Sequence, residues 1–113
     1  MIEAYPKEIR IYATTDGRMP YTEWSRGLDP EARARIQIRL DNVRRGNLGH
    51  RKSVGKGVTE LKVDYGPGYR IYIGQQGKRV IVLLCGGDKR RQQRDIEQAQ
   101  DYWADYKKRK DDA

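Results

Sequence analysis

Cationic side chains and a tyrosine occur in segments of the chain that alternate apolar and polar residues. Lys62 lies in VTELKVDY, Arg70 and Tyr72 lie in YRIYIGQ, and Arg79 directly precedes VIVLLC. An Arg can bind a phosphate through two parallel N–H groups, a Lys adds a compact charge, and a Tyr can stack on an unpaired base. On one rigid surface, these side chains would suit the backbone of a nucleic acid.

A second basic group lies in the Gly-rich segment 46–57, GNLGHRKSVGKG. It contains His50, Arg51, Lys52 and Lys56, which would add phosphate contacts if this loop lies beside the first group. The alternative is an ordinary exposed loop. Histidine is the side chain that titrates near neutrality without help, so His50 is also a candidate general base, although a lone loop histidine is more often simply exposed.

A third group follows the apolar segment VIVLLC and reads GGDKRRQ. Gly86 and Gly87 allow close approach to the backbone, and the helix that follows would offer free N–H groups to an anion. Asp88 is placed to cap that helix. Lys89 and Arg91 oppose the helix dipole, so a role other than helix stability is indicated for them.

Familiar catalytic sets are absent from the sequence. It contains no Ser/His/Asp arrangement, no phosphate-binding P-loop and no carboxylate cluster for a metal, and we expect no cofactor. Cys85, at the end of an apolar strand, reads as a core residue and not as a nucleophile. A nuclease built on these residues would therefore act on RNA, whose 2′-hydroxyl can attack the adjacent phosphate without a metal.

The charge distribution supports a polyanionic partner. The chain has 113 residues and a net charge of +8, and residues 33–91 alone carry 15 basic and 4 acidic side chains. The alternative is a generally basic, soluble surface. The length fits one domain over residues 1–113, and no membrane-spanning or secretory segment is seen. A single cysteine fits a reducing cytoplasm, so we expect a cytoplasmic protein.

The pattern along the chain predicts strands and helices that would carry these groups. We expect strands over 7–13, 58–65, 69–75 and 80–85, the last one central because it is apolar on both faces. Helices are expected from Pro20 to Gly27, from Asp29-Pro30 to Gly46-Asn47, and from about 88 to 110. The two longer helices should bury Ala32, Ile36, Leu40, Val43 and then Ile96, Ala99, Trp103, Tyr106.

A register follows if Gly66-Pro67-Gly68 is a three-residue turn and Gln76-Gly77 a two-residue turn. Asp64 would then face Arg70, and Lys62 would face Tyr72. Val80, Val82 and Leu84 would join the apolar face of Leu61, Val63, Ile71 and Ile73, with helices packed on it. The other face would carry Lys62, Arg70, Tyr72 and Arg79. A competing interpretation of that face is solvated ion pairs, Asp64 with Arg70 and Glu60 with Lys62.

Two stretches of the chain closely resemble the RelE/ParE toxin superfamily: GVTELKVDYGPGYRIYIGQ and VIVLLCGGDKRRQQRDIEQAQDYW. Within the superfamily, the resemblance is strongest to the HigB-like "addiction module killer protein" branch. The resemblance covers nearly the whole chain. It implies an α+β fold, β-α-α-β-β-β-α, with a curved four-stranded, mainly antiparallel sheet. It also implies a toxin of a type II toxin–antitoxin module that is neutralised by a helix-turn-helix antitoxin. The complex of toxin and antitoxin would bind DNA.

The resemblance leaves the target open. RelE- and HigB-like members are endoribonucleases, mRNA interferases that cleave mRNA on the ribosome without a metal and so inhibit translation. ParE-like members inhibit DNA gyrase by binding it. A degenerate toxin that survives as a binding module is a third alternative, since a shared fold does not decide the function.

Site residues are implied by the resemblance one by one. Arg70 matches the arginine that contacts the scissile phosphate, Lys62 matches the basic position after Glu-Leu, and Lys89 matches the lysine after the last strand. Lys56 lies where the nuclease members carry loop lysines. The chain departs from the pattern at the strand end, where many members place a Tyr, His or Phe; here Asp88 is the candidate base.

Overall fold

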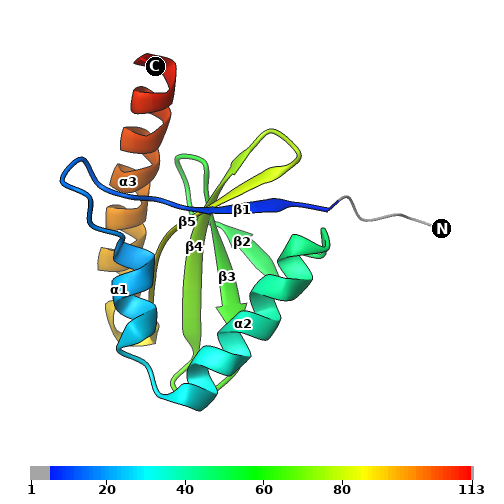
Figure 1. Ribbon diagram of the computed structural model, residues 1–113. Coiled ribbons are helices and arrows are strands. Elements are labelled where there is room, and N and C mark those ends of the chain that lie inside the picture. The colour runs from blue at the N-terminus through cyan, green and yellow to red at the C-terminus, as the bar shows by residue number, and fades with distance from the viewer. Residues whose placement is uncertain (1–5, 113) are drawn as a thin grey trace.

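In the computed structural model, which describes residues 6–112, a five-stranded sheet forms the centre of the fold (Figure 1). The strand order is β1-β5-β4-β3-β2, with β1 parallel to β5 and the other neighbours antiparallel. The bounds are β1 Glu8–Ile11, β2 Arg51–Ser53, β3 Val58–Val63, β4 Tyr69–Gln76 and β5 Val80–Gly87. The α+β class is confirmed.

The expectation of four strands is wrong by one. β2 lies within the segment 46–57 that was expected to be a loop, and it pairs with β3 through Arg51 opposite Leu61 and Ser53 opposite Thr59. All three of its residues are exposed. An edge strand with no buried side chain has no apolar alternation, so the sequence carries no pattern that would predict it.

Of the three helices, α2 begins with the side-chain cap that the sequence indicates. The helices are α1 Pro20–Arg26, α2 Pro30–Arg44 and α3 Gln92–Asp112, and a short 3-10 turn, η1 Lys89–Arg91, leads into α3. Asp29 caps α2 by accepting a hydrogen bond from the Ala32 N–H at 3.3 Å, as expected for a helix that starts Asp-Pro. None of the described helices combines the length and apolar character that a membrane span requires.

Helices cover both faces of the sheet, and the expectation of one covered face is wrong (Figure 1). One core joins α1 and α2 to the sheet through residues such as Ile36, Leu61 and Ile71. The second core joins α3 to the opposite face, where Trp103 packs with Tyr72 among other residues. β5 is buried on both faces, which confirms its predicted central position.

The β3–β4 hairpin is offset by two residues from the predicted register. Val63 pairs with Tyr69, Lys62 with Arg70, and Glu60 with Tyr72, so that residues 64–68 form a five-residue turn. Because side chains alternate with a period of two, a slip of two residues leaves each side chain on its predicted face. The predicted grouping of Leu61 and its neighbours is therefore confirmed, whereas the predicted pairing of individual residues is wrong.

The β4–β5 hairpin departs further from the prediction. Gln76 pairs with Val80, which makes a three-residue turn that contains Arg79, and the register is irregular between Tyr72 and Ile73. As a result Val82 lies in the core under α3 and not with Leu61. Leu84 also lies in the core under α3. Ile81 and Leu83 pack with Leu61 instead, in the positions predicted for Val82 and Leu84.

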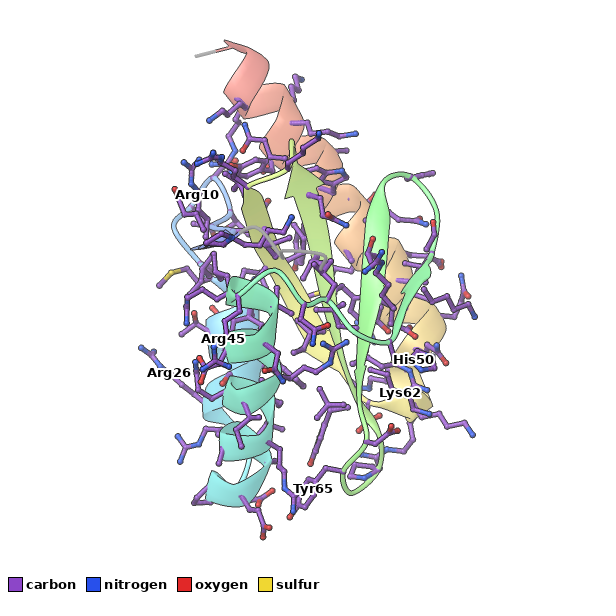
Figure 2. All side chains as sticks on the ribbon, turned by 90° about the vertical axis from the view of Figure 1, so that its right-hand side faces the viewer. Arg10, Arg26, Arg45, His50, Lys62 and Tyr65 are labelled. Atoms are coloured by element: carbon purple, nitrogen blue, oxygen red, sulfur yellow. The ribbon has the colours of Figure 1, made fainter. Side chains whose placement is uncertain are left out.

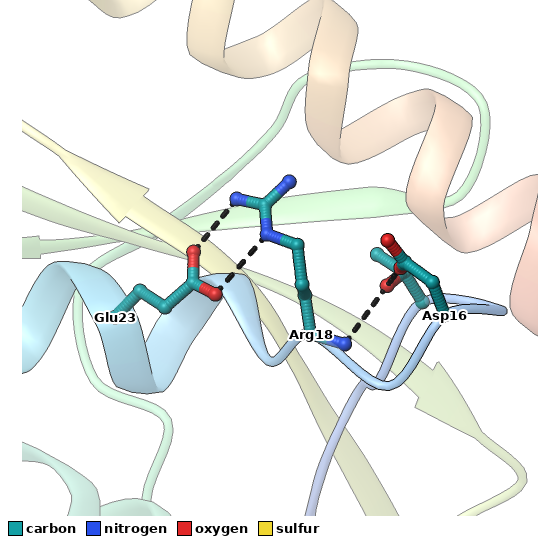
Figure 3. Close-up of polar contacts among 4 residues, drawn as sticks. Asp16, Arg18 and Glu23 are labelled. Carbon is teal, nitrogen blue, oxygen red and sulfur yellow. Dashed lines mark hydrogen bonds and ion pairs between the residues drawn. The ribbon is translucent and has the colours of Figure 1, made fainter.

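The loop that leads into α1 is fixed by polar contacts. Arg18 donates to both carboxylate oxygens of Glu23, at 2.7 and 3.2 Å, and its backbone N–H donates to Thr14 Oγ1 at 3.0 Å (Figure 3). A two-point Arg–carboxylate contact constrains geometry more than a single hydrogen bond. These contacts tie the start of α1, and with it Trp24, to the chain that leaves β1.

Candidate functional site

A hollow of about 400 Å³ lies at the end of the sheet where β3 turns into β4. It is lined by Lys62, Asp64, Tyr65, Gly66, Pro67, Gly68, Arg70 and Lys89. Three of the cations that the sequence singled out for phosphate chemistry, Lys62, Arg70 and Lys89, thus meet in one place although they come from β3, β4 and η1. We call this space the cationic hollow.

The turn 64–68 holds the guanidinium of Arg70 from one side. Arg70 Nη1 donates to the carbonyl oxygen of Gly68 at 2.9 Å. Gly68 has φ +82°, and Gly66 φ +56°, a backbone conformation that glycine adopts without strain. The Gly-Pro-Gly motif therefore fixes the Arg70 side chain as well as reversing the chain.

A buried carboxylate holds Arg70 from the other side. Arg70 Nε lies 3.6 Å from Glu60 Oε1, with only 9% and 6% of the two side chains exposed. Glu60 Oε2 accepts hydrogen bonds from the Tyr72 hydroxyl at 3.1 Å and from Gln92 Nε2 at 2.9 Å. These contacts partly offset the cost of burying the carboxylate. We call Glu60, Arg70, Tyr72 and Gln92 the buried polar cluster.

Glu60 and Gln92 support the site although neither was predicted to do so from the sequence. Glu60 was expected, if paired at all, to pair with Lys62. A signal was present, since Glu60, Arg70 and Tyr72 share one predicted face of the hairpin. Because α3 was not predicted to pack on that face, however, the face was expected to be open to solvent.

Arg70 retains hydrogen-bonding capacity. Within the part of the chain that the structure describes, Arg70 Nε is the one buried side-chain nitrogen or oxygen that has no hydrogen-bond partner. A buried N–H without a partner is costly, and such groups are rare in proteins. Nε faces the Glu60 carboxylate at 3.6 Å, so on this side Arg70 is held by an ion pair and not by a hydrogen bond.

Lys62 keeps its charge at the surface. Its Nζ lies 3.5 Å from Asp64 Oδ1, and the two side chains are 44% and 85% exposed. The predicted ion pairs Asp64–Arg70 and Glu60–Lys62 are therefore wrong, because the partners are exchanged. An exposed pair of this kind contributes little to stability, so an anion in the hollow could replace Asp64 as the partner of Lys62.

Tyr72 does not lie on an open face, and that expectation is wrong. Its side chain is fully buried under α3. Burial first, and then the nearby Glu60 carboxylate, raise the pKa of the Tyr72 hydroxyl above its ordinary value. In this position Tyr72 cannot stack on a base, and its hydroxyl donates a hydrogen bond to the Glu60 carboxylate.

His50 lies beside Lys62. Arg39, on α2, bridges the two by donating to the carbonyl oxygens of His50 at 2.7 Å and of Lys62 at 3.2 Å. Figure 2 shows both side chains near the free edge of the sheet. His50 therefore neighbours Lys62, although it does not itself line the cationic hollow.

The other basic residues of segment 46–57 do not line the cationic hollow. Arg51 and Lys52 lie on β2 and are exposed. Lys56 lies in the turn between β2 and β3 with φ +54°, at the end of β3 opposite to Lys62. A Cβ added at the neighbouring Gly57 would lie 2.8 Å from Trp103 Nε1 of α3, so Lys56 belongs to another part of the surface.

Arg79 also lies away from the hollow. It occupies the β4–β5 turn, whereas Arg70 is at the beginning of the eight-residue strand β4. At about 3.3 Å per residue, a strand of this length separates the two by on the order of 25 Å. The prediction that Arg79 and Arg70 share one surface patch is wrong.

Asp88 and Arg91 line a second hollow, next to the first, together with Trp24, Gly86, Gly87, Arg90 and Asp95. Asp88 accepts hydrogen bonds from the Arg90 N–H at 2.9 Å and from its side chain at 3.1 Å. It is a cap, as predicted, but of the 3-10 turn η1 that leads into α3 and not of α3 itself. The hydrogen bond from the Arg90 side chain is the main cause of a lowered pKa of Asp88. A carboxylate of lowered pKa is a weaker base, which reduces its fitness for proton abstraction.

Cys85 is a core residue, as expected. It is buried, and burial, with a smaller effect of Asp95, raises the pKa of its thiol to about 12. Its Sγ lies 3.8 Å from the carbonyl oxygen of Asp95. A thiol in this state is not a nucleophile at neutral pH. Among the described residues, no three His, Cys, Asp or Glu side chains gather in a way that could hold a metal ion.

Comparison with known proteins places the chain in a family without adding an activity. A protein of Haemophilus influenzae (strain ATCC 51907 / DSM 11121 / KW20 / Rd), described as "Uncharacterized protein", is 47% identical over 68 residues, which are 60% of this chain and 69% of the relative. The chain belongs to the same family as that protein. No protein-family profile matches the chain, and no solved structure matches it.

Proposed function

We propose that this protein is the toxin of a type II toxin–antitoxin module, of the RelE/ParE superfamily and its HigB-like branch, and that it cleaves mRNA on the ribosome. The observation that carries the proposal is the convergence of Lys62, Arg70 and Lys89 on one hollow. Three cations on three elements form a site for a phosphodiester, whose negative charge increases during cleavage.

The chemistry proposed is attack by the 2′-hydroxyl of the RNA on the adjacent phosphate. The 2′-oxygen loses its proton to a base and bonds to phosphorus, while the bond from phosphorus to the 5′-oxygen breaks and that oxygen takes up a proton. The products are a 2′,3′-cyclic phosphate and a 5′-hydroxyl. This reaction requires orientation, charge neutralisation and proton transfer, and no metal takes part in the proposed step.

The three cations have different tasks in this scheme. Arg70, fixed by Glu60 and by the Gly68 carbonyl, is the rigid contact to the phosphate. Lys62 and Lys89 are exposed, so they can follow the substrate and neutralise the charge that develops on its oxygens. For the base, His50 beside Lys62 is a better candidate than Asp88, whose pKa is lowered.

Such a toxin would act in the cytoplasm and would need a neutralising partner. We expect a helix-turn-helix antitoxin whose acidic segment covers Lys62 and Lys89, since an acidic chain is the natural competitor for a phosphate site. Co-purification with the product of the neighbouring gene tests this. The expected result is a complex that weakens as salt rises, and failure to form any complex would remove the toxin–antitoxin part of the proposal.

Variants at the lysines test the site more cleanly than variants at Arg70. Removing Arg70 would leave Glu60 as an unpaired buried charge, so lost activity could reflect lost folding. Lys62→Ala and Lys89→Ala change exposed side chains and should each lower mRNA cleavage by on the order of 100-fold with an unchanged fold. Lys108→Ala, an exposed site on α3, is the control for the same loss of charge and should cleave like the wild type.

The same variants separate the alternatives when growth arrest, transcripts and DNA damage are followed together. Arrest with cut transcripts that is lost in Lys62→Ala and Lys89→Ala supports the proposal. Arrest with intact transcripts and a DNA-damage response supports a gyrase inhibitor. Binding of the antitoxin without any arrest indicates a degenerate toxin.

A further inference from the structure

A second hollow of about 540 Å³ adjoins the cationic hollow. Its lining residues come from α1, from the end of β5 and from the chain that leads into α3; Figure 1 shows these elements. Two links join the hollows: Gly87 pairs with Arg70 in the β4–β5 ladder, and Asp88 directly precedes Lys89. A polymer held in the cationic hollow would therefore have its neighbouring group close to this space.

The walls of the second hollow are an indole and a carboxylate on a floor of glycine. A Cβ added at Gly86 would overlap the ring of Trp24, and one added at Gly87 would overlap the carboxylate of Asp95. Both side chains therefore lie directly on the bare backbone of β5. Arg90 and Arg91, both exposed, form the rim.

Asp95 is the polar group in this hollow whose contacts are incomplete. Its side chain is half-buried, and among the described residues it has no hydrogen bond and no ion pair closer than 4 Å. Asp88, by contrast, is already engaged by Arg90. Burial raises the pKa of Asp95, and the nearby Arg91 opposes this effect. A ligand with N–H groups would supply the missing hydrogen bonds.

We propose that this hollow binds a nucleobase of the RNA whose phosphate lies in the cationic hollow, and that Asp95 selects guanine. The inference rests on the proposed function. A carboxylate accepts two hydrogen bonds side by side, and guanine offers two adjacent N–H donors on its pairing edge, whereas uracil offers one. The Trp24 indole supplies an apolar and aromatic wall for the ring of the base.

Binding of nucleoside 3′,5′-bisphosphates tests this without any cleavage. Guanosine and uridine 3′,5′-bisphosphate carry the same phosphates and differ in the base, and their affinities can be measured by calorimetry and by the NMR shift of the Trp24 indole N–H. We expect the guanosine compound to bind about tenfold more tightly, the equivalent of one hydrogen bond to a charged group. Equal affinities in the wild type would overturn the inference.

Two variants distinguish the base site from the phosphate site. Asp95→Asn should abolish the tenfold preference by lowering the affinity for the guanosine compound alone. Asp101→Asn changes an exposed residue of the same helix and should keep the preference. Lys62→Ala should weaken both compounds equally. If Lys62→Ala weakens both but Asp95→Asn keeps the preference, the base site is wrong and the phosphate site stands. If Lys62→Ala weakens neither, the cationic hollow does not bind phosphate, and the proposed function fails with it.

Discussion

Arg70 Nε lies 3.6 Å from Glu60 Oε1, and at least nine-tenths of each side chain is buried. The cation that faces the proposed phosphate is thus held from inside the protein, whereas Lys62 and Lys89 reach the hollow from its surface. A rigid charge of this kind needs no reorganisation when a substrate arrives, which is the arrangement that electrostatic catalysis favours.

Glu60→Ala should destabilise the protein by about 3–5 kcal/mol, because it leaves Arg70 as a buried charge without its counter-ion. Urea unfolding measures this directly. Asp64→Ala is the matched control: its pair with Lys62 is exposed, and we expect a change within about 0.5 kcal/mol. Equal effects of the two substitutions would show that Glu60 does not compensate Arg70.

Tyr72→Phe should lower the free energy of unfolding by about 1–3 kcal/mol, since the Glu60 carboxylate loses a buried hydrogen bond of 3.1 Å. RNA binding should be unchanged, because the ring is fully buried. Tyr69→Phe serves as the comparison, since its hydroxyl makes no hydrogen bond to another described residue. A loss of RNA affinity in Tyr72→Phe with unchanged stability would contradict the buried position of Tyr72.

Gly74→Ala tests the packing of α3 on the sheet. A Cβ at Gly74 would overlap the ring of Trp103, so the helix or the strand must shift, at a cost of about 1–3 kcal/mol. Gly27→Ala is the control, because a Cβ there meets only the Trp24 carbonyl oxygen at an ordinary 3.6 Å. Thermal unfolding should separate the two variants clearly, and coincident melting curves would mean that Trp103 does not lie on Gly74.

Stability should fall in alkali partly because of Cys85. Burial raises the pKa of its thiol to about 12 in the folded protein, above the ordinary value of 9.0. Below pH 9 the thiol is protonated in both states. Between pH 9 and 12 the unfolded state ionises first, so stability is lost by up to about 1.4 kcal/mol per pH unit. Cys85→Ala should show a shallower pH dependence than the wild type, and identical slopes would argue against a buried thiol.

Helix boundaries and the convergence of cations could be predicted from local patterns. Asp29-Pro30 caps and opens α2, and the side-chain alternation of β3 and β4 put Lys62 and Arg70 on one face. Such patterns depend only on neighbours in the chain. The two-residue slip of the hairpin escaped the prediction because it leaves every side chain on the same face.

The burial of Arg70 and Tyr72 could not be predicted in the same way. It depends on which face α3 covers, and that brings together residues distant in the sequence, such as Tyr72 and Trp103 in one core. One hint was available. The buried stripe of α3 needs an apolar partner, and the other face was already taken by α2.

The ends of the cut RNA test the central claim most directly. Purified protein, ribosomes and a translated mRNA are combined, and the termini of the fragments are identified. The account predicts fragments that carry a 2′,3′-cyclic phosphate and a 5′-hydroxyl, formed by the wild type and by Lys108→Ala but greatly reduced in Lys62→Ala and Lys89→Ala. Intact mRNA, or fragments that end in a 3′-hydroxyl and a 5′-phosphate, would contradict it.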